Sequence, residues 1–208
     1  LLHAQIERAR VVKSGAGVLG GLHYLRSNKP LGLLVLLGVV TALFGRSYTQ
    51  MLPIFAEGTF HRGATGYSAL LTAAGLGAIA GAFVLTRFAS AKERWKIVAL
   101  AYLASHGALV GFALTSHYAI AIGCITIVAA GAVVATTSAG TVIQTQVPPD
   151  LRGRVVALHV VTVIGLPFFG SLGVTALAKA TTPTTAVCMF SAISAAFVGL
   201  WALFAPKP

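Results

Sequence analysis

Long runs of apolar residues alternate with short polar connections along most of this chain. The runs occupy residues 31–55, 65–88, 97–114, 118–143, 155–177 and 185–204. An α-helix needs about 20 apolar residues to cross roughly 30 Å of hydrocarbon, and each run approaches or exceeds that length. The pattern predicts an all-α membrane protein whose six transmembrane helices form one domain at 29–208.

Residues 1–28 differ from the rest because basic and apolar residues are mixed there. Val18, Leu22 and Leu25 recur at i, i+4 and i+7 next to Arg26, so they would form one apolar stripe on a helix. This is typical of an amphipathic helix lying on the cytoplasmic membrane face. Four glycines at 15–21 weaken helix formation, so a disordered basic linker is the alternative.

The composition is 57% hydrophobic and 9% charged, and the net charge of +11 has a simpler cause than nucleic-acid binding. Twelve of the fifteen Lys and Arg residues fall before the first run, at or after the end of the second, after the fourth or after the last. Arg62 and Lys179 lie at the opposite helix ends, and Arg46 lies inside the first run. Since cytoplasmic loops are enriched in Lys and Arg, we expect a multi-pass protein of the cell's inner membrane with both termini in the cytoplasm. No nucleic-acid partner is expected.

Nothing in the sequence indicates a cofactor or a metal site. Cys124 and Cys188 lie in apolar runs without Cys or His neighbours at ligand spacing, so we expect them to pack as small apolar residues. Gly75 and Gly77 begin no dinucleotide fingerprint, because no strand precedes them.

Arg46 is the formal charge that lies well inside an apolar run. Counted from Leu31, its backbone would lie about 22 Å into a slab of roughly 30 Å, nearer the outer face. Thr49, Gln50 and Pro53 follow at i+3, i+4 and i+7 and would extend a polar face. Such a charge usually faces a bundle interior or a wet cavity, although a long side chain at this depth can also snorkel to the outer headgroups.

Run 118–143 and the residues after it carry a second polar stripe. Thr137, Gly140, Thr141 and Gln144 fall at i, i+3, i+4 and i+7, on one helix face. We interpret this stripe as a cavity wall. The alternative is structural, because a threonine hydroxyl can donate to its own helix backbone.

Three further features concern helix packing. Gly77 and Gly81 form a small-xxx-small pair that lets two helix backbones approach closely. His106 has no acid nearby in sequence, so we expect a neutral imidazole in a helix interface rather than a proton carrier. Run 185–204 is nearly free of polar features and suits a lipid-facing position.

The stretch 144–170, QTQVPPDLRGRVVALHVVTVIGLPFFG, joins two apolar runs. Pro148 and Pro149 cannot continue a helix, so the preceding helix should stop near Gln146. A new helix can start at Asp150, whose carboxylate favours a helix N-terminus.

The segments IQTQVPPDLRGRVVALHVV and GLPFFGSLG resemble the loop between helices ten and eleven, and helix eleven itself, of the major facilitator superfamily. The resemblance extends to GGLHYLRSNKPLGLL, YTQMLPIFA and GATGYSALLTAAGLGAIAGA, and is strongest to the drug and siderophore exporters that include macrolide-efflux and enterobactin-exporter proteins. It implies the carboxyl-terminal half of a twelve-helix transporter, with two inverted three-helix repeats and residues 1–28 as the central cytoplasmic loop. A chain that starts at Leu1 rather than Met fits such a segment. The implied partners are the lipid bilayer, a small-molecule substrate and the amino-terminal six-helix half.

In this superfamily helices seven, eight, ten and eleven line the substrate cavity, whereas nine and twelve face lipid. The resemblance therefore argues against a transport role for His106, which would lie on the ninth helix. The loop after the second run departs from the superfamily's Gly-rich, Asp-Arg signature, because Glu93 is its only acid and the expected Asp is absent.

The implied function is secondary-active efflux of a small molecule, such as a drug or siderophore, by alternating access. We expect residues on a substrate path, in a cytoplasmic gate and at a helix bend. The path residues are Arg46, Gln50, Thr137, Thr141 and Gln144; the gate residues are Asp150, Arg152 and Arg154; the bend lies at Gly165 and Pro167. Since no Asp or Glu lies deep in a run, a proton-carrying carboxylate would belong to the other half.

Two alternatives remain open from the sequence. One is a six-span membrane protein that transports nothing. The other is an intramembrane serine protease with Ser138 as the nucleophile, although the last run holds no His and no G-x-S-G motif is present. We expect a transporter rather than an enzyme.

Overall fold

The computed structural model describes residues 17–87 and 91–204, and the regular secondary structure in these ranges is helical. The expectations for residues 1–16 and for the loop at 88–90 lie outside the described residues. The first part contains α2 (Gly17–Ser27), α3 (Lys29–Val40), a π-helical turn η1 (Thr41–Gly45), a 3₁₀ turn η2 (Ser47–Gln50), the short α4 (Leu52–Ile54) and a second π-helical turn η3 (Phe55–Thr59). Five long helices follow: α5 (Gly63–Leu85), α6 (Ala91–Leu114), α7 (Tyr118–Gln146), α8 (Pro149–Ala180) and α9 (Pro183–Phe204).

Six helical segments of the described chain are long and apolar enough to cross a membrane. They are Lys29–Thr59, Gly63–Leu85, Trp95–Leu114, Tyr118–Gln146, Pro149–Ala180 and Pro183–Leu203. Each contains one of the six apolar runs or nearly all of it, so the predicted all-α, six-span fold is confirmed.

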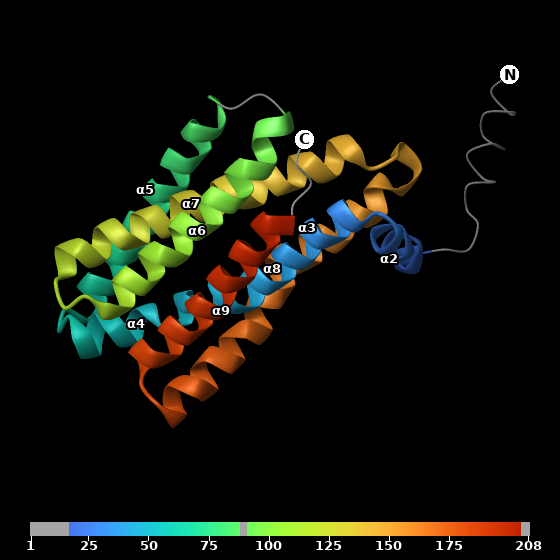
Figure 1. The fold of residues 1–208 in the computed structure, drawn as a ribbon. Coiled ribbons are helices and arrows are strands. Elements are labelled where there is room, and N and C mark those ends of the chain that lie inside the picture. The colour runs from blue at the N-terminus through green and yellow to red at the C-terminus, as the bar shows by residue number, and fades with distance from the viewer. Residues whose placement is uncertain (1–16, 88–90, 205–208) are drawn as a thin grey trace, which may run out of the picture.

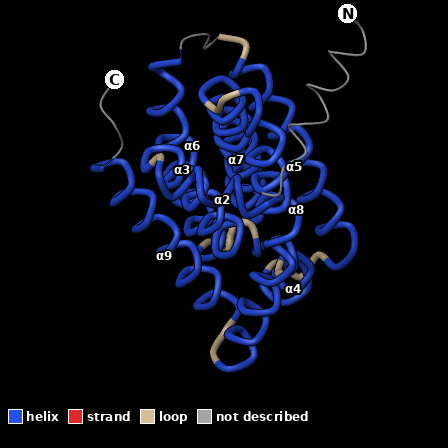
Figure 2. The backbone as a smooth tube through the Cα atoms, turned by 90° about the vertical axis from the view of Figure 1, so that its right-hand side faces the viewer, coloured by secondary structure: helices blue, strands red, loops and turns tan. Residues whose placement is uncertain are grey.

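The six spans run back and forth between two ends of one bundle (Figure 1). α2, the end of α5 and the turn between α7 and α8 lie towards one end. The turns before α5, between α6 and α7, and between α8 and α9 lie towards the other. α7 packs along both α5 and α6, and α9 lies at an edge beside α6 (Figure 2).

The turn between α7 and α8 follows the proline rule. α7 ends at Gln146 as predicted, and Val147 adopts an extended conformation after it. Pro148 is the N-cap residue of α8, which begins at Pro149, one residue before the predicted start. The Arg152 guanidinium donates a hydrogen bond of 3.4 Å to the Val147 carbonyl, so α8 is fastened to the end of α7.

Glycines allow α7 to approach its two neighbours closely. A Cβ atom on Gly77 or Gly81 of α5 would meet the backbone of Thr126 or Ala130 on α7, which confirms the predicted small-xxx-small contact. On the opposite side, Gly131 of α7 faces the backbone of α6. α7 is therefore the central helix against which α5 and α6 are positioned.

Most threonine hydroxyls in the spans donate to carbonyls of their own helix. These bonds join Thr72 to Ser68, Thr126 to Ile122, Thr136 to Ala132, Thr141 to Thr137, Thr145 to Thr141 and Thr162 to Leu158, over 2.7–3.0 Å. Such hydroxyls are satisfied without water or a neighbouring helix.

α2 packs on the first turns of α8. Gly21 lies against Arg154 and Leu158, and Leu25 is buried. Leu22 remains 48% exposed, so the two described members of the predicted apolar stripe have different surroundings. Asn28 then separates α2 from α3, and its side chain accepts a hydrogen bond from the Leu31 N–H at the start of α3.

Buried apolar residues form two clusters at different heights of the bundle. The α2-end cluster includes Leu31, Leu34, Leu37, Tyr102, Ala135 and the stacked pair Trp95 and Trp201, whose ring centroids are 5.8 Å apart. The far-end cluster includes Tyr48, Phe55, Leu109, Phe112 and Val128. Along the first span, α6 and α7, one cluster stops before the other begins, and the residues between them build the site.

Candidate functional site

The first span loses its α-helical geometry between the two clusters. The Arg46 N–H donates to the Thr41 carbonyl at 3.1 Å, five residues back, which closes the π-helical turn. The chain then tightens into η2, and Arg46 itself has φ −99° and ψ −6°. Single π-helical turns inside helices often occur at functional sites. Arg46, the charged residue in the middle of this span, therefore lies where the backbone is irregular.

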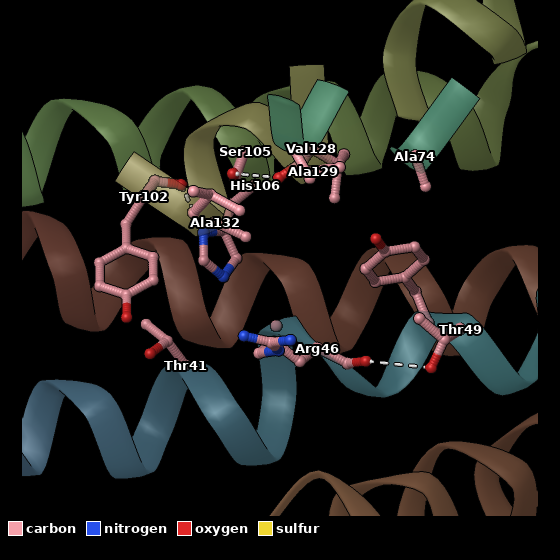
Figure 3. Close-up of a pocket in the computed structure, with 14 residues that line it drawn as sticks. Thr41, Arg46, Thr49, Ala74, Tyr102, Ser105, His106, Val128, Ala129 and Ala132 are labelled. Atoms are coloured by element: carbon pink, nitrogen blue, oxygen red, sulfur yellow. Dashed lines mark hydrogen bonds between the residues drawn. The ribbon is translucent and has the colours of Figure 1, made fainter. Parts of the chain in front are cut away.

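A cavity of about 220 Å³ opens beside this break. It lies between the first span, α5, α6 and α7, and Figure 3 shows side chains from α6 facing Arg46 and Thr41 across it. Small residues, among them Ala74, Ala78 and Ala132, leave the space open. Arg46 is partly buried. It is the charged residue among those that line the cavity, and none of the lining residues is Asp or Glu.

His106 of α6 forms part of the cavity wall and is only 3% exposed. Its Nδ1 lies 2.5 Å from the Tyr102 carbonyl, an acceptor, so Nδ1 carries the proton. Nε2 is buried and has no hydrogen-bond partner among the described residues. The ring rests where a side chain on Gly45 would lie, so glycine is required there.

Hydroxyl groups surround the same space. Ser105 donates to the Val128 carbonyl at 2.9 Å and so joins α6 to α7 at the cavity wall. The Tyr102 hydroxyl points towards Thr41 (Figure 3), whose own hydroxyl donates to the Leu37 carbonyl at 2.8 Å. The site thus places one guanidinium, one imidazole ring and several side chains with hydroxyl groups around a small space inside the bundle.

Residues 3–206 match the family described as transmembrane secretion effectors, which is part of the major facilitator superfamily. The chain belongs to the transmembrane secretion effector family. Membership makes the protein a transporter of the major facilitator type, and its six spans make it a multi-pass membrane protein. No curated protein and no solved structure gave a significant match.

The predicted path residues separate into two groups. Arg46 lines the cavity, but Gln50 is exposed and does not, whereas Thr49 does. The 3₁₀ geometry of η2 explains the exchange, because side chains three residues apart eclipse each other in a helix of three residues per turn. The predicted polar face assumed 3.6 residues per turn, which fails at this break.

Thr137, Thr141 and Gln144 do not line the Arg46 cavity. Thr137 lines a second space of about 210 Å³ between α7 and α8, together with His159. Thr141 donates to the Thr137 carbonyl at 2.9 Å, as in the structural alternative, and Gln144 is exposed.

The gate and bend residues lie along α8. Asp150 is exposed in its first turn, Arg152 binds the Val147 carbonyl, and Arg154 lies beneath Gly21 of α2. α8 continues through Pro167 without ending. Gly170, one turn later, packs against the Leu43 carbonyl and the Ser47 hydroxyl and so supports the break in the first span.

The sequence reasoning missed the contribution of α6. Tyr102, Ser105 and His106 lie at i, i+3 and i+4, a polar stripe of the kind that drew attention to α7, but the family resemblance directed attention away from this helix. Among the described residues, no group of three or more His, Cys, Asp or Glu side chains could hold a metal ion.

Proposed function

We propose that this chain is the carboxyl-terminal half of a secondary-active exporter of the drug and siderophore branch. It moves a small molecule by alternating access between two six-helix halves, and its own spans form two inverted three-helix repeats. The observation that carries the proposal is the cavity at Arg46, which lies at mid-height of the bundle in a member of a transporter family. Intramembrane charges of this kind usually mark a substrate or ion pathway.

The face of α7 that closes the cavity continues towards the α2 end. Ala129 and Val133 line the cavity, and Thr137 and Thr141 follow at steps of four residues on the same face. Gln144 is on the next turn. The substrate path is therefore proposed to run from Arg46 along this face, with Thr137 and the space beside His159 further along it.

The proposed partners are the lipid bilayer, the small-molecule substrate and an amino-terminal six-helix half. Large apolar side chains stand exposed on α5 and α8, such as Phe83, Ile164 and Phe168. A second half and lipid would cover them. A proton-carrying carboxylate is assigned to the other half, because the cavity lining holds none.

Both termini are proposed to lie in the cytoplasm, with the protein in the inner membrane. The proposed gate follows from this orientation, because Asp150, Arg152 and Arg154 then lie at the cytoplasmic end and would change partners when the two halves rock. Reporter fusions at Arg94 and Lys179 test the orientation, and reporters on the same side of the membrane would contradict it.

The geometry around Ser138 does not support the serine protease alternative. Ser138 is fully buried, and its hydroxyl makes no hydrogen bond with any described residue. A nucleophilic serine needs a base within hydrogen-bond reach. Labelling of Ser138 by a serine-reactive probe would revive this alternative.

Transport is tested with the full-length protein in inside-out membrane vesicles. Uptake of a panel of dyes, drugs and iron chelators is measured with and without a pH gradient, against vesicles from cells that lack the protein. Concentrative uptake that collapses with the gradient is expected for a secondary-active exporter. Equal uptake by both vesicle preparations across the panel would favour the six-span protein that transports nothing.

A further inference from the structure

We infer that the joint between α2 and α3 is a binding site for the phosphate headgroup of an anionic phospholipid. The inference goes beyond the proposed transport function and does not depend on it, because it needs only the six membrane spans that the chain has. It rests on a hollow at this joint, on the outward face of α2 and on the charge at this end of the bundle.

The joint lies where the first span enters the bilayer. Lys29 is the first residue of a span of 31 residues, and the apolar run starts two residues later at Leu31. At about 1.5 Å per residue the span is about 45 Å long, whereas the hydrocarbon of a bilayer is about 30 Å thick. The excess length places the ends of the span, and therefore Lys29, at the level of the lipid headgroups.

An open hollow of about 520 Å³ lies at this joint. It is lined by Tyr24, Ser27, Asn28, Lys29 and Pro30. The volume falls within the ~300–1,000 Å³ of sites that bind small molecules. Because the hollow is open rather than enclosed, it suits a headgroup that stays attached to acyl chains in the bilayer.

The hydrogen bonds at the joint leave donors available to a ligand. The Asn28 side chain accepts a hydrogen bond from the Leu31 N–H at 3.4 Å and donates one to the Tyr24 hydroxyl oxygen at 3.3 Å. The Tyr24 O–H is therefore directed away from Asn28 and can donate to a ligand, as can the Lys29 ammonium group. A phosphate diester matches these donors, because it brings a negative charge and several acceptor oxygens.

The two sides of α2 have different surroundings. Gly21 and Leu25 are buried, whereas Leu22 and Arg26, one turn apart, are exposed. An exposed leucine beside an exposed arginine is typical of a helix that lies between headgroups and acyl chains. A soluble phosphate would gain nothing from Leu22, so this face favours a lipid as the occupant.

The charge at this end of the bundle favours an anionic lipid. Among the side chains that the structure describes there, Asp150 is the acidic one, and the cationic ones are Arg26, Lys29, Arg87, Lys96, Arg152 and Arg154. Clusters of about four to eight Lys and Arg beside a span attract anionic lipids. The sequence before α2 does not complement this charge, because residues 1–16 contain Arg8, Arg10 and Lys13 against Glu7.

The test compares phosphatidylglycerol with phosphatidylcholine, two lipids that can carry the same acyl chains and differ in net headgroup charge. Their binding to the delipidated full-length protein in an uncharged detergent is measured by native mass spectrometry. The first phosphatidylglycerol is expected to bind about tenfold more tightly than the first phosphatidylcholine, because two cations lie at the joint. An excess of glycerol 1-phosphate, the soluble probe, should not displace the lipid.

Two matched double variants locate the site. Arg26→Gln with Lys29→Gln should abolish the preference for phosphatidylglycerol. Arg87→Gln with Lys96→Gln removes the same charge from the same end, outside the residues that line the hollow, and should keep the preference. Both should melt near the wild-type temperature, because all four side chains are exposed.

Two single variants assign the remaining contacts. Tyr24→Phe should reduce the preference for phosphatidylglycerol severalfold, because it removes one donor and keeps the ring. Leu22→Ser should weaken both lipids alike and leave the preference between them, because it removes only apolar contact.

Several results would overturn the site. Equal binding of the two lipids to the wild-type protein would remove it, and an equal loss of preference in the two double variants would leave only a diffuse attraction to this end. Displacement by glycerol 1-phosphate would assign the hollow to a soluble phosphate instead. Absent transport in vesicles would remove the proposed function and leave the lipid site standing.

Discussion

The first span and α5 are neighbours in sequence and are both apolar enough to cross a membrane, yet they are built differently. The first span breaks twice into π-helical turns and once into a 3₁₀ turn, whereas α5 is regular from Gly63 to Leu85. In the most apolar window of each, 56% of the first span is buried against 22% of α5. The more buried span carries Arg46, and the more exposed span carries the packing pair Gly77 and Gly81.

This contrast separates two uses of glycine. In α5, Gly77 and Gly81 bring two regular helices together, and their role is packing. In the first span, Gly45 makes room for the His106 side chain of another helix and places it beside a charge. The regular helix α5 therefore serves to assemble the bundle, whereas the irregular first span forms the wall of the Arg46 cavity.

The largest effect is expected for substitutions that disrupt the packing of α5 on α7. In the double variant of Gly77→Ala and Gly81→Ala, each new methyl group meets α7 backbone that cannot move aside. Overpacking of this kind costs about 1–3 kcal/mol per site, so the apparent melting temperature of the full-length protein should fall strongly. Gly75→Ala is the control, because nothing lies within 4 Å of its added Cβ, and it should cause no loss. Equal melting temperatures for both variants would contradict the contact.

The next largest effect is expected for a substitution that changes the Arg46 cavity and leaves the helix packing of the bundle intact. Gly45→Ala forces the imidazole of His106 away, and the displaced group is a side chain rather than backbone. The stability cost should stay at about 1 kcal/mol, but transport in vesicles should fall about tenfold, because the wall of the Arg46 cavity changes shape. Gly58→Ala, in the same span with an open Cβ position, should transport normally. A normal rate in Gly45→Ala would dissociate His106 from transport.

A smaller effect is expected at the α2 end. Replacing Arg152 and Arg154 by Gln should leave insertion and melting temperature nearly unchanged, because exposed charged contacts contribute about 0–1 kcal/mol. Transport should slow severalfold if these residues exchange partners during the cycle. Arg87→Gln, an exposed cation after α5, is the control. Unchanged transport in the double variant removes the gate.

The smallest effect is expected within the first span, where substitutions at two adjacent residues, Thr49 and Gln50, are compared. Thr49→Val should weaken transport about twofold to fivefold, since one hydroxyl contact contributes roughly 0.5–1 kcal/mol, whereas Gln50→Ala should have no effect. The expected order follows from the 3₁₀ turn, which places Thr49 and not Gln50 in the cavity wall. The reverse order, measured as initial uptake rates in vesicles, would favour a regular helix at this point.

The six spans were predictable from sequence because hydrocarbon thickness imposes a length that apolar runs must meet. The stop at Gln146 was predictable because proline lacks a donor, and the contact through Gly77 and Gly81 because small residues recur at four-residue spacing. These features depend on residue type and local spacing alone. Arg46 could be selected for the same reason, as a charge in an apolar run.

The rest of the site depends on information that local spacing does not contain. The change from π-helical to 3₁₀ geometry at Arg46 depends on contacts with α8, where Gly170 meets the Leu43 carbonyl, and no period in the first span indicates it. For this reason Gln50 rather than Thr49 was chosen as a path residue from a polar face that included both. His106 was expected in a helix interface, but its contact with Gly45 could not be predicted, because Gly45 lies on a different helix.

The self-bonded threonines have a consequence for how the protein enters its bilayer. A hydroxyl that donates to the carbonyl one turn behind it offers its methyl group to the surroundings, so Thr72, Thr126 or Thr162 costs little to partition into lipid. We therefore expect the insertion machinery to treat these segments as more hydrophobic than their amino-acid composition indicates. Counting hydroxyls would therefore overestimate how much water the interior holds, and the cavity beside Arg46 is a better indicator of where water or cargo can go.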